Sequence, residues 1–209
     1  MKSIVTLLVV LLQATLAQAA GTYLPPAEHT VQNCATVEWE KVECTYFDGT
    51  GTYATAGPVA DAVAITGYGM ESVGDAAWSL ASRFKKDAPS CYGPASKLSK
   101  LKSYAKKVVG GKSLSSCQKA CVAKCITSHY LKTDYSKAGN STACQAANAK
   151  AGDCQAFSAL SDAVLDTLGA KSRTAHSFTM GHAYNKVEAD GEWLYYEPMN
   201  DRCEFYVTP

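Results

Sequence analysis

The stretch GDCQAFSALSDAVLDTLG, residues 152–169, decides the fold that we expect for this chain. Apolar residues follow Cys154 at spacings of three and four, which is the pattern of a helix with one buried side. They are Ala156, Phe157, Leu160, Ala163, Val164 and Leu168. Gly169 supplies a C-terminal stop. The sequence therefore predicts a helix that begins at Cys154.

A cysteine in the first turn of a helix has a chemical advantage. Unpaired backbone N–H groups and the helix dipole stabilise a thiolate at that position. The same N–H groups are available to an oxyanion that develops on a bound carbonyl. Cys154 is therefore a candidate nucleophile. The alternative is an ordinary half-cystine, with another cysteine left unpaired.

A base for this cysteine is expected from the stretch GHAYNKVEADGEWLYYEP, residues 181–198. Of the histidines that follow the helix, His176 and His182, the second opens this stretch, and Asp190-Gly191 at its centre is a strong signal for a tight hairpin turn. That turn pairs Tyr184 with Glu197, which makes Glu197 the diagonal neighbour of His182 on one sheet face. A carboxylate there can fix the tautomer of the imidazole and stabilise the imidazolium.

Each of these residues also has a purely structural explanation. His182 could be a strand histidine with a local hydrogen bond, and Glu197 could face solvent at a strand end. Three aromatic residues of the hairpin, Trp193, Tyr195 and Tyr196, are better explained as sheet core than as a platform for substrate.

The motifs GDCQAF (152–157), GHAY (181–184) and WLYYEP (193–198), in this order, resemble the core of the transglutaminase-like superfamily of papain-type thiol enzymes. The segment YLKTDY (130–135) is similar to the one that usually precedes the family's cysteine helix, so the resemblance covers about residues 117–201. It implies an α+β fold in which the nucleophilic cysteine, at a helix N-terminus, packs on an antiparallel sheet.

By this resemblance Cys154 is the nucleophile, His182 the base and Glu197 the orienting acid. The family usually has Asp before the proline, so Glu197 is a departure from its pattern. The function implied is a thiol hydrolase that acts on amide bonds of a peptide, protein or cell-wall substrate through a Cys154 thioester. A cross-linking transglutaminase and a non-catalytic binding protein on the same fold are the alternatives. No cofactor is implied, and no acidic calcium loop is apparent.

The N-terminus and the cysteines indicate an oxidising compartment, either secreted or periplasmic. Residues 1–19 have the basic start, apolar middle and small-residue exit of a signal peptide, with cleavage expected after Ala19. The nine cysteines of such a chain predict a disulfide framework. Cys117, Cys121 and Cys125 share one face of a predicted helix over 115–131, where disulfides are favoured over a zinc site. The odd number predicts four disulfides and one free thiol, at Cys154.

Charge and patterning complete the expectation. Twenty basic residues against 19 acidic ones give no field that would recruit nucleic acid or an acidic membrane surface. After residue 19 no segment is apolar enough to span a bilayer. We expect an extension over 20–110, with a strand at 36–47 and helices at 75–86 and 97–109, followed by a catalytic core over 111–209.

Overall fold

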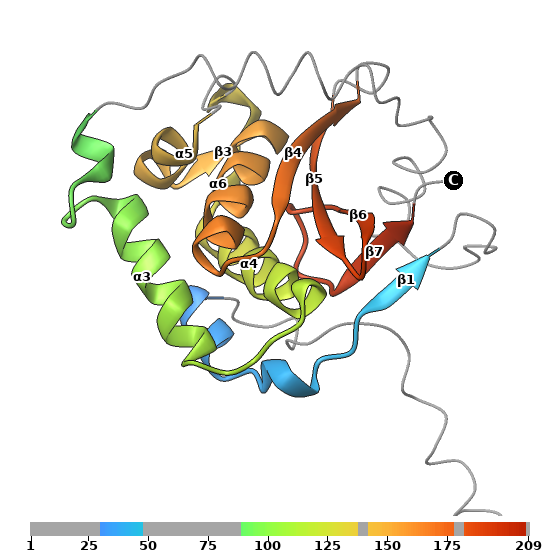
Figure 1. Cartoon of the computed structure of the whole chain (residues 1–209). Helices are drawn as coiled ribbons and strands as arrows, with labels where there is room; N and C mark the ends of the chain where they lie inside the picture. The colour runs from blue at the N-terminus through green and yellow to red at the C-terminus, as the bar shows by residue number, and fades with distance from the viewer. Residues whose placement is uncertain (1–29, 48–88, 138–141, 178–181, 208–209) are drawn as a thin grey trace, which may run out of the picture.

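A computed structural model describes residues 30–47, 89–137, 142–177 and 182–207 of the chain (Figure 1). The predicted signal peptide and the predicted helix at 75–86 lie outside these residues. The described part combines helices with a mainly antiparallel sheet, as the α+β prediction required. Within it, no helix has the length and apolar character needed to cross a membrane.

The main sheet has five strands in the order β1-β7-β6-β5-β4. Its strands are β1 (Thr45–Phe47), β4 (Ser172–Ser177), β5 (His182–Ala189), β6 (Glu192–Tyr196) and β7 (Glu204–Val207). Strands β4 to β7 run antiparallel to their neighbours, and β1 pairs in parallel with β7 at one edge. Two short parallel strands, β2 (Lys132–Thr133) and β3 (Ala151–Gly152), pair separately just before the cysteine helix.

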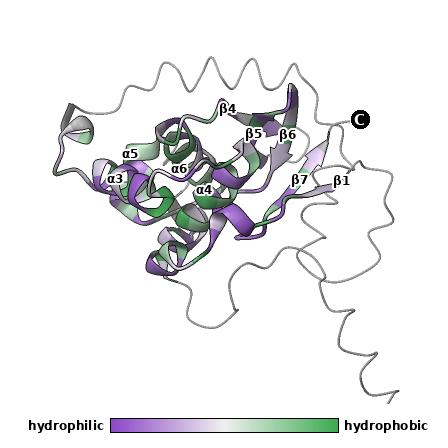
Figure 2. Cartoon of the chain, turned by 60° about the horizontal axis from the view of Figure 1, so that its bottom comes forward, coloured by the Kyte–Doolittle hydropathy of each residue, from purple (hydrophilic) through white to green (hydrophobic). Residues whose placement is uncertain are grey.

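Four helices lie on one side of the main sheet (Figure 1): α3 (Lys97–Val109), α4 (Ser116–Tyr130), α5 (Ala143–Ala149) and α6 (Cys154–Thr167). Helices α4 and α6 pack on each other and on β5, while α3 and α5 lie outside them. The helix over 97–109 is confirmed. It buries Leu98, Leu101 and Ala105 while Lys100 and Lys106 are exposed, so that Figure 2 shows both polar and apolar colours along it.

The β5–β6 hairpin has the register that the sequence predicted. Asp190 and Gly191 form the turn with φ of 53° and 87°, the left-handed backbone of a type I′ turn. Asn185 pairs with Tyr196 at the other end of the ladder. Each of these two residues is fixed to α6: the Asn185 Nδ2 donates to the Ser158 carbonyl (3.0 Å), and the Tyr196 hydroxyl lies 2.9 Å from Ser161 Oγ. The hairpin is thus locked to the cysteine helix.

The predicted strand at 36–47 is wrong except for its last three residues, which form β1. The rest contains the 3-10 helix η2 (Trp39–Lys41), and a further 3-10 helix, η1 (Val31–Ala35), lies just before the segment. Trp39 is fully buried, and its indole N–H donates to the Cys34 carbonyl (2.8 Å). Two further 3-10 helices are η3 (Pro89–Tyr92) and η4 (Tyr135–Lys137).

Four disulfides tie the molecule together, and all nine cysteines lie in described residues. The bonds are Cys34–Cys125, Cys44–Cys117, Cys91–Cys144 and Cys121–Cys203. Sulfur atoms of Cys44, Cys121 and Cys203 lie within 4.8 Å of one another, as zinc ligands would, but each is already bonded to another sulfur. The disulfide interpretation of the helix cysteines is therefore confirmed. The predicted division of the chain after residue 110 stays a prediction.

Candidate active site

Cys154 is the first residue of α6, as predicted, and the one cysteine outside the disulfides. The residues just before Cys154 are held in place by the pairing of β3 with β2. A further hydrogen bond runs from the Asp134 N–H to the Gly152 carbonyl (2.9 Å). Cys154 is 8% exposed, so little of the residue is accessible from solvent. Gly169, with φ of 70°, follows the other end of α6.

Asp153 caps this helix, a role that the sequence reasoning missed. Its Oδ1 accepts the N–H groups of Gln155 (3.0 Å) and Ala156 (3.3 Å), while its carbonyl accepts the N–H of Phe157. Within the first turn of α6, the N–H of Cys154 is the donor to which Asp153 does not bond. An aspartate before the first periodic residue of a helix is a recognisable N-cap signal, and it was present in the sequence.

His182 begins β5, and it contacts both of the other candidate residues. Its Nε2 lies in hydrogen-bond contact with Glu197 Oε2, and a second side-chain hydrogen bond joins the ring to Cys154. Because Nε2 faces the carboxylate, Nδ1 is the ring nitrogen available to the thiol. The three residues therefore form a chain from sulfur to imidazole to carboxylate.

The protonation of His182 reflects these partners. Burial lowers its pKa, but the hydrogen bonds to Cys154 and Glu197, and the negative charges of both groups, raise it to about 10. Three-quarters of the side chain is shielded from solvent, since 23% of it is exposed. The raised pKa of His182 thus favours its imidazolium form at neutral pH.

Glu197 is held at both oxygens. Oε2 contacts His182, and Oε1 accepts the backbone N–H of Met199 (2.8 Å). Neighbouring polar residues that might have taken its place have other partners: Asp201 lies 3.5 Å from His129, and Asn200 Oδ1 accepts the N–H of Arg202. The glutamate that stands where the family usually has Asp therefore contacts His182.

The comparisons with known proteins found one family match and two partial structural likenesses. Residues 102–198 match the model of the transglutaminase-like superfamily. The match covers slightly less than half of the chain. The matched region contains the cysteine helix, both strands of the hairpin and Glu197. A match of this kind supports a thiol hydrolase or transferase in general, without choosing the reaction.

Two solved structures share a partial likeness. One is a protein of Cytophaga hutchinsonii provisionally assigned as a cysteine protease, at 18% identity and a TM-score of 0.41, over 55% of this chain and 42% of that one. The other is described as a TGase, at 13% identity and a TM-score of 0.41, over 59% of this chain and 36% of that one. The chain thus spans less than half the length of either. No curated protein matches it.

Proposed function

We propose that the protein is a thiol hydrolase acting on amide bonds, with Cys154 as nucleophile, His182 as acid and base, and Glu197 as the residue that orients His182. The observation that carries this proposal is the hydrogen-bonded chain Cys154–His182–Glu197, built on the one cysteine that no disulfide uses. The disulfides are consistent with an oxidising compartment, and we propose that the protein is exported there.

The proposed reaction has two halves. The thiolate of Cys154 attacks the amide carbonyl, the N–H of Cys154 faces the developing oxyanion, and the His182 imidazolium gives its proton to the departing amine. The C–N bond breaks and a thioester remains. Water then attacks the thioester while neutral His182 takes a proton from it. The C–S bond breaks, the carboxylic acid leaves, and the thiolate of Cys154 and the imidazolium of His182 are restored.

The role of Glu197 is electrostatic and geometric. It accepts from Nε2 and so keeps Nδ1 directed at the sulfur, and its charge stabilises the imidazolium in the resting state. Its own orientation is set by the Met199 N–H, which belongs to the turn after Pro198. The third member is therefore positioned by backbone rather than by a flexible side chain.

The decisive experiment identifies the bond that the full chain breaks or forms. Purified protein is incubated with peptide and cell-wall mixtures, and the products are identified by mass spectrometry. New carboxyl termini support hydrolysis, whereas a new amide between two chains would mean that an amine is the acceptor and that the protein is a cross-linking transglutaminase. If neither appears and iodoacetamide labels native Cys154 no faster than a free thiol, the protein is a binding module and the proposal fails.

Matched variants accompany this experiment. Cys154→Ala and His182→Ala should each reduce turnover by at least about a thousandfold, because they remove members of one catalytic unit. Lys106→Ala, an exposed change on α3, should leave turnover unchanged. Full activity of either site variant would contradict the assignment.

A further inference from the structure

One side of α6 carries the nucleophile and two buried serines. Cys154, Ser158 and Ser161 follow one another at steps of four and three residues, so they lie along one stripe of the helix. Both serines are 0% exposed, although a serine is normally found at the surface. The other buried residues of α6 are apolar: Ala156, Phe157, Leu160, Val164 and Leu165. The stripe below Cys154 therefore presents polar groups inside an otherwise apolar interface.

The β5–β6 hairpin meets this stripe with two polar side chains of its own. Asn185 Nδ2 donates to the Ser158 carbonyl (3.0 Å), and the Tyr196 hydroxyl lies 2.9 Å from Ser161 Oγ. Asn185 is 0% exposed and Tyr196 is 1% exposed. Two residues further along the same side of β5, Val187 belongs to the hydrophobic core. The helix and the hairpin are thus joined by two polar contacts within the core.

Both contacts adjoin members of the candidate site. Asn185 follows His182 by three residues on β5, and Tyr196 ends β6 directly before Glu197. On the helix, the first of the two serines lies one turn after Cys154. The two hydrogen bonds therefore join the helix that begins with the nucleophile to the strand that begins with the base and to the strand end that precedes the acid. A shift of the hairpin at either contact would also displace the base from the nucleophile.

Stability alone is a poor explanation for these contacts. A buried hydrogen bond replaces hydrogen bonds to water, so its net contribution is small, and an apolar pair of the same shape can be equally stable. Tyr196→Phe together with Ser161→Ala would fill nearly the same volume with apolar groups. An apolar pair lacks direction, however, whereas a hydrogen bond weakens steeply when its geometry is disturbed. The polar contacts therefore select one position of the hairpin on the helix.

We propose that Asn185 and Tyr196 are positioning residues of the site. Their buried hydrogen bonds to α6 hold the hairpin, with His182 and Glu197 on it, at one register against the helix that begins at Cys154. The inference deepens the proposed function and rests on it, because it assigns two further residues to the same site. Such precision matters for catalysis, since a displacement of about 1 Å between reacting groups can reduce a rate about a hundredfold.

The test is a variant that keeps the volume of the interface and removes one of its two polar contacts. In the combined variant Tyr196→Phe with Ser161→Ala, both partners of the hydrogen bond are replaced, so Tm should stay within a few degrees of the wild type. Alkylation of Cys154 by iodoacetamide, measured at neutral pH on the full chain with its disulfides intact, should nevertheless be several-fold slower. The midpoint of its pH profile should move to higher pH, because an imidazolium that is held less closely stabilises the thiolate less.

A second variant tests the other contact independently. Asn185→Leu keeps the approximate volume of the side chain but removes the donor to the Ser158 carbonyl, and it should slow the alkylation of Cys154 in the same way. This variant keeps the inference open to refutation even if the combined variant does not fold. Alkylation at the wild-type rate in whichever of these variants fold would overturn the inference.

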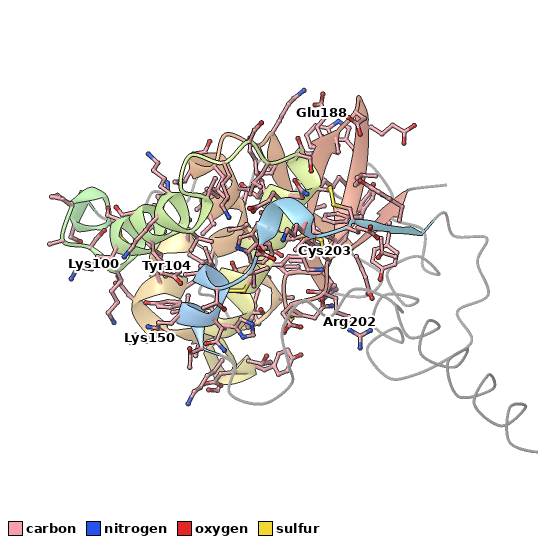
Figure 3. All side chains as sticks on the ribbon, turned by 90° about the horizontal axis from the view of Figure 1, so that it is seen from below. Lys100, Tyr104, Lys150, Glu188, Arg202 and Cys203 are labelled. Carbon is pink, nitrogen blue, oxygen red and sulfur yellow. A yellow bond between two sulfur atoms is a disulfide. The ribbon has the colours of Figure 1, made fainter. Side chains whose placement is uncertain are left out.

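Tyr104→Phe is the matched control for the loss of a tyrosine hydroxyl. That hydroxyl donates to the Val31 carbonyl (2.7 Å), and Figure 3 shows Tyr104 on α3, apart from Arg202 and Cys203 in the segment that follows β6. The change should lower Tm because it leaves one partner of the hydrogen bond behind, but the alkylation rate of the folded protein should not change. Equal slowing of alkylation in Tyr104→Phe and in the combined variant would overturn the inference.

The wild-type rate separates this inference from the proposed function. If wild-type Cys154 is alkylated no faster than glutathione at the same pH, the proposed function fails, and the inference fails with it. If the wild type reacts faster than glutathione and the variants of the two contacts react as fast as the wild type, the proposed function stands and the inference alone is overturned.

Discussion

At the scale of single residues, the candidate site joins a cysteine at the start of α6 to a histidine at the start of β5 and a glutamate that follows β6. Cys154, His182 and Glu197 could be placed because a helix start and a tight turn each have a sharp local signal. The buried Lys124 of α4 could not be placed by such signals, because its burial depends on which cysteines pair. One sequence signal did exist: Lys124 follows Cys121 by three residues and so shares the helix face that the disulfides bury.

Glu197→Gln tests the pairing at this scale. The amide keeps the volume of the side chain but loses the negative charge, which is one cause of the raised pKa of His182. The pKa of His182 should therefore fall from about 10, as read from the ring proton resonances by NMR. Asp201→Asn is the matched control, since Asp201 lies against His129 instead, and should leave the His182 titration where it was. A larger shift in the control would identify Asp201 as the acid.

Asp153→Asn tests the cap that adjoins the nucleophile. Asparagine can still accept the N–H groups of Gln155 and Ala156, so the helix should lose only a few tenths of a kcal/mol. Without the neighbouring negative charge the thiolate of Cys154 is favoured, and its alkylation rate at acidic pH should rise several-fold. Asp166→Asn, at the other end of α6, should leave the rate unchanged. A slower reaction in Asp153→Asn would show that the carboxylate activates the site instead.

At the scale of elements, the prediction failed where disulfides override a local pattern. Cys34 and Cys44 are bonded to Cys125 and Cys117, which lie eight residues apart on α4 and so about 12 Å along its axis. A strand from Cys34 to Cys44 would be about 33 Å long. The chain must therefore shorten, which it does through η1 and η2. The alternation of apolar and polar residues could not reveal this, because the disulfide connectivity is not written in it.

Gly191→Ala tests the turn that sets the hairpin register. Its φ of 87° is strained for any residue with a Cβ, so the change should cost about 1 kcal/mol of unfolding free energy and lower Tm by a few degrees. Gly93→Ala is the control: its backbone is not left-handed, and the new Cβ would meet the nearest atom, the Ser90 carbonyl oxygen, at an ordinary 3.7 Å. Equal effects of the two changes would contradict a special role of the turn.

At the scale of the whole molecule, one hydrophobic core joins segments distant in the sequence. It extends from Cys34 near the start of the described residues to Phe205 in β7, and α4 is the element to which most of the disulfides connect. Two titratable groups near the end of β6, the partly buried His182 and the fully buried Lys124, respond to pH in opposite directions. His182 has a pKa raised to about 10, and Lys124 has one lowered to about 8. The free energy of unfolding should therefore depend on the protonation of both groups.

Their signs predict an unusual pH profile of the unfolding free energy. His182 contributes stability that is complete below the unfolded pKa of about 6.5 and is lost as pH rises toward 10. Lys124 acts the other way: folding becomes easier as pH rises from about 8 toward the unfolded value of 10.5, because the folded state releases this proton first.

The free energy of unfolding, measured with guanidinium chloride at intact disulfides, should thus fall by about 2 kcal/mol between pH 6.5 and 8 and then level off. His182→Ala should remove the fall, and Lys124→Met should remove the levelling, so that its stability continues to decline toward pH 10. A wild-type profile that stays flat from pH 6.5 to 8 would mean that His182 gains no proton-binding advantage from Cys154 and Glu197 in the folded state.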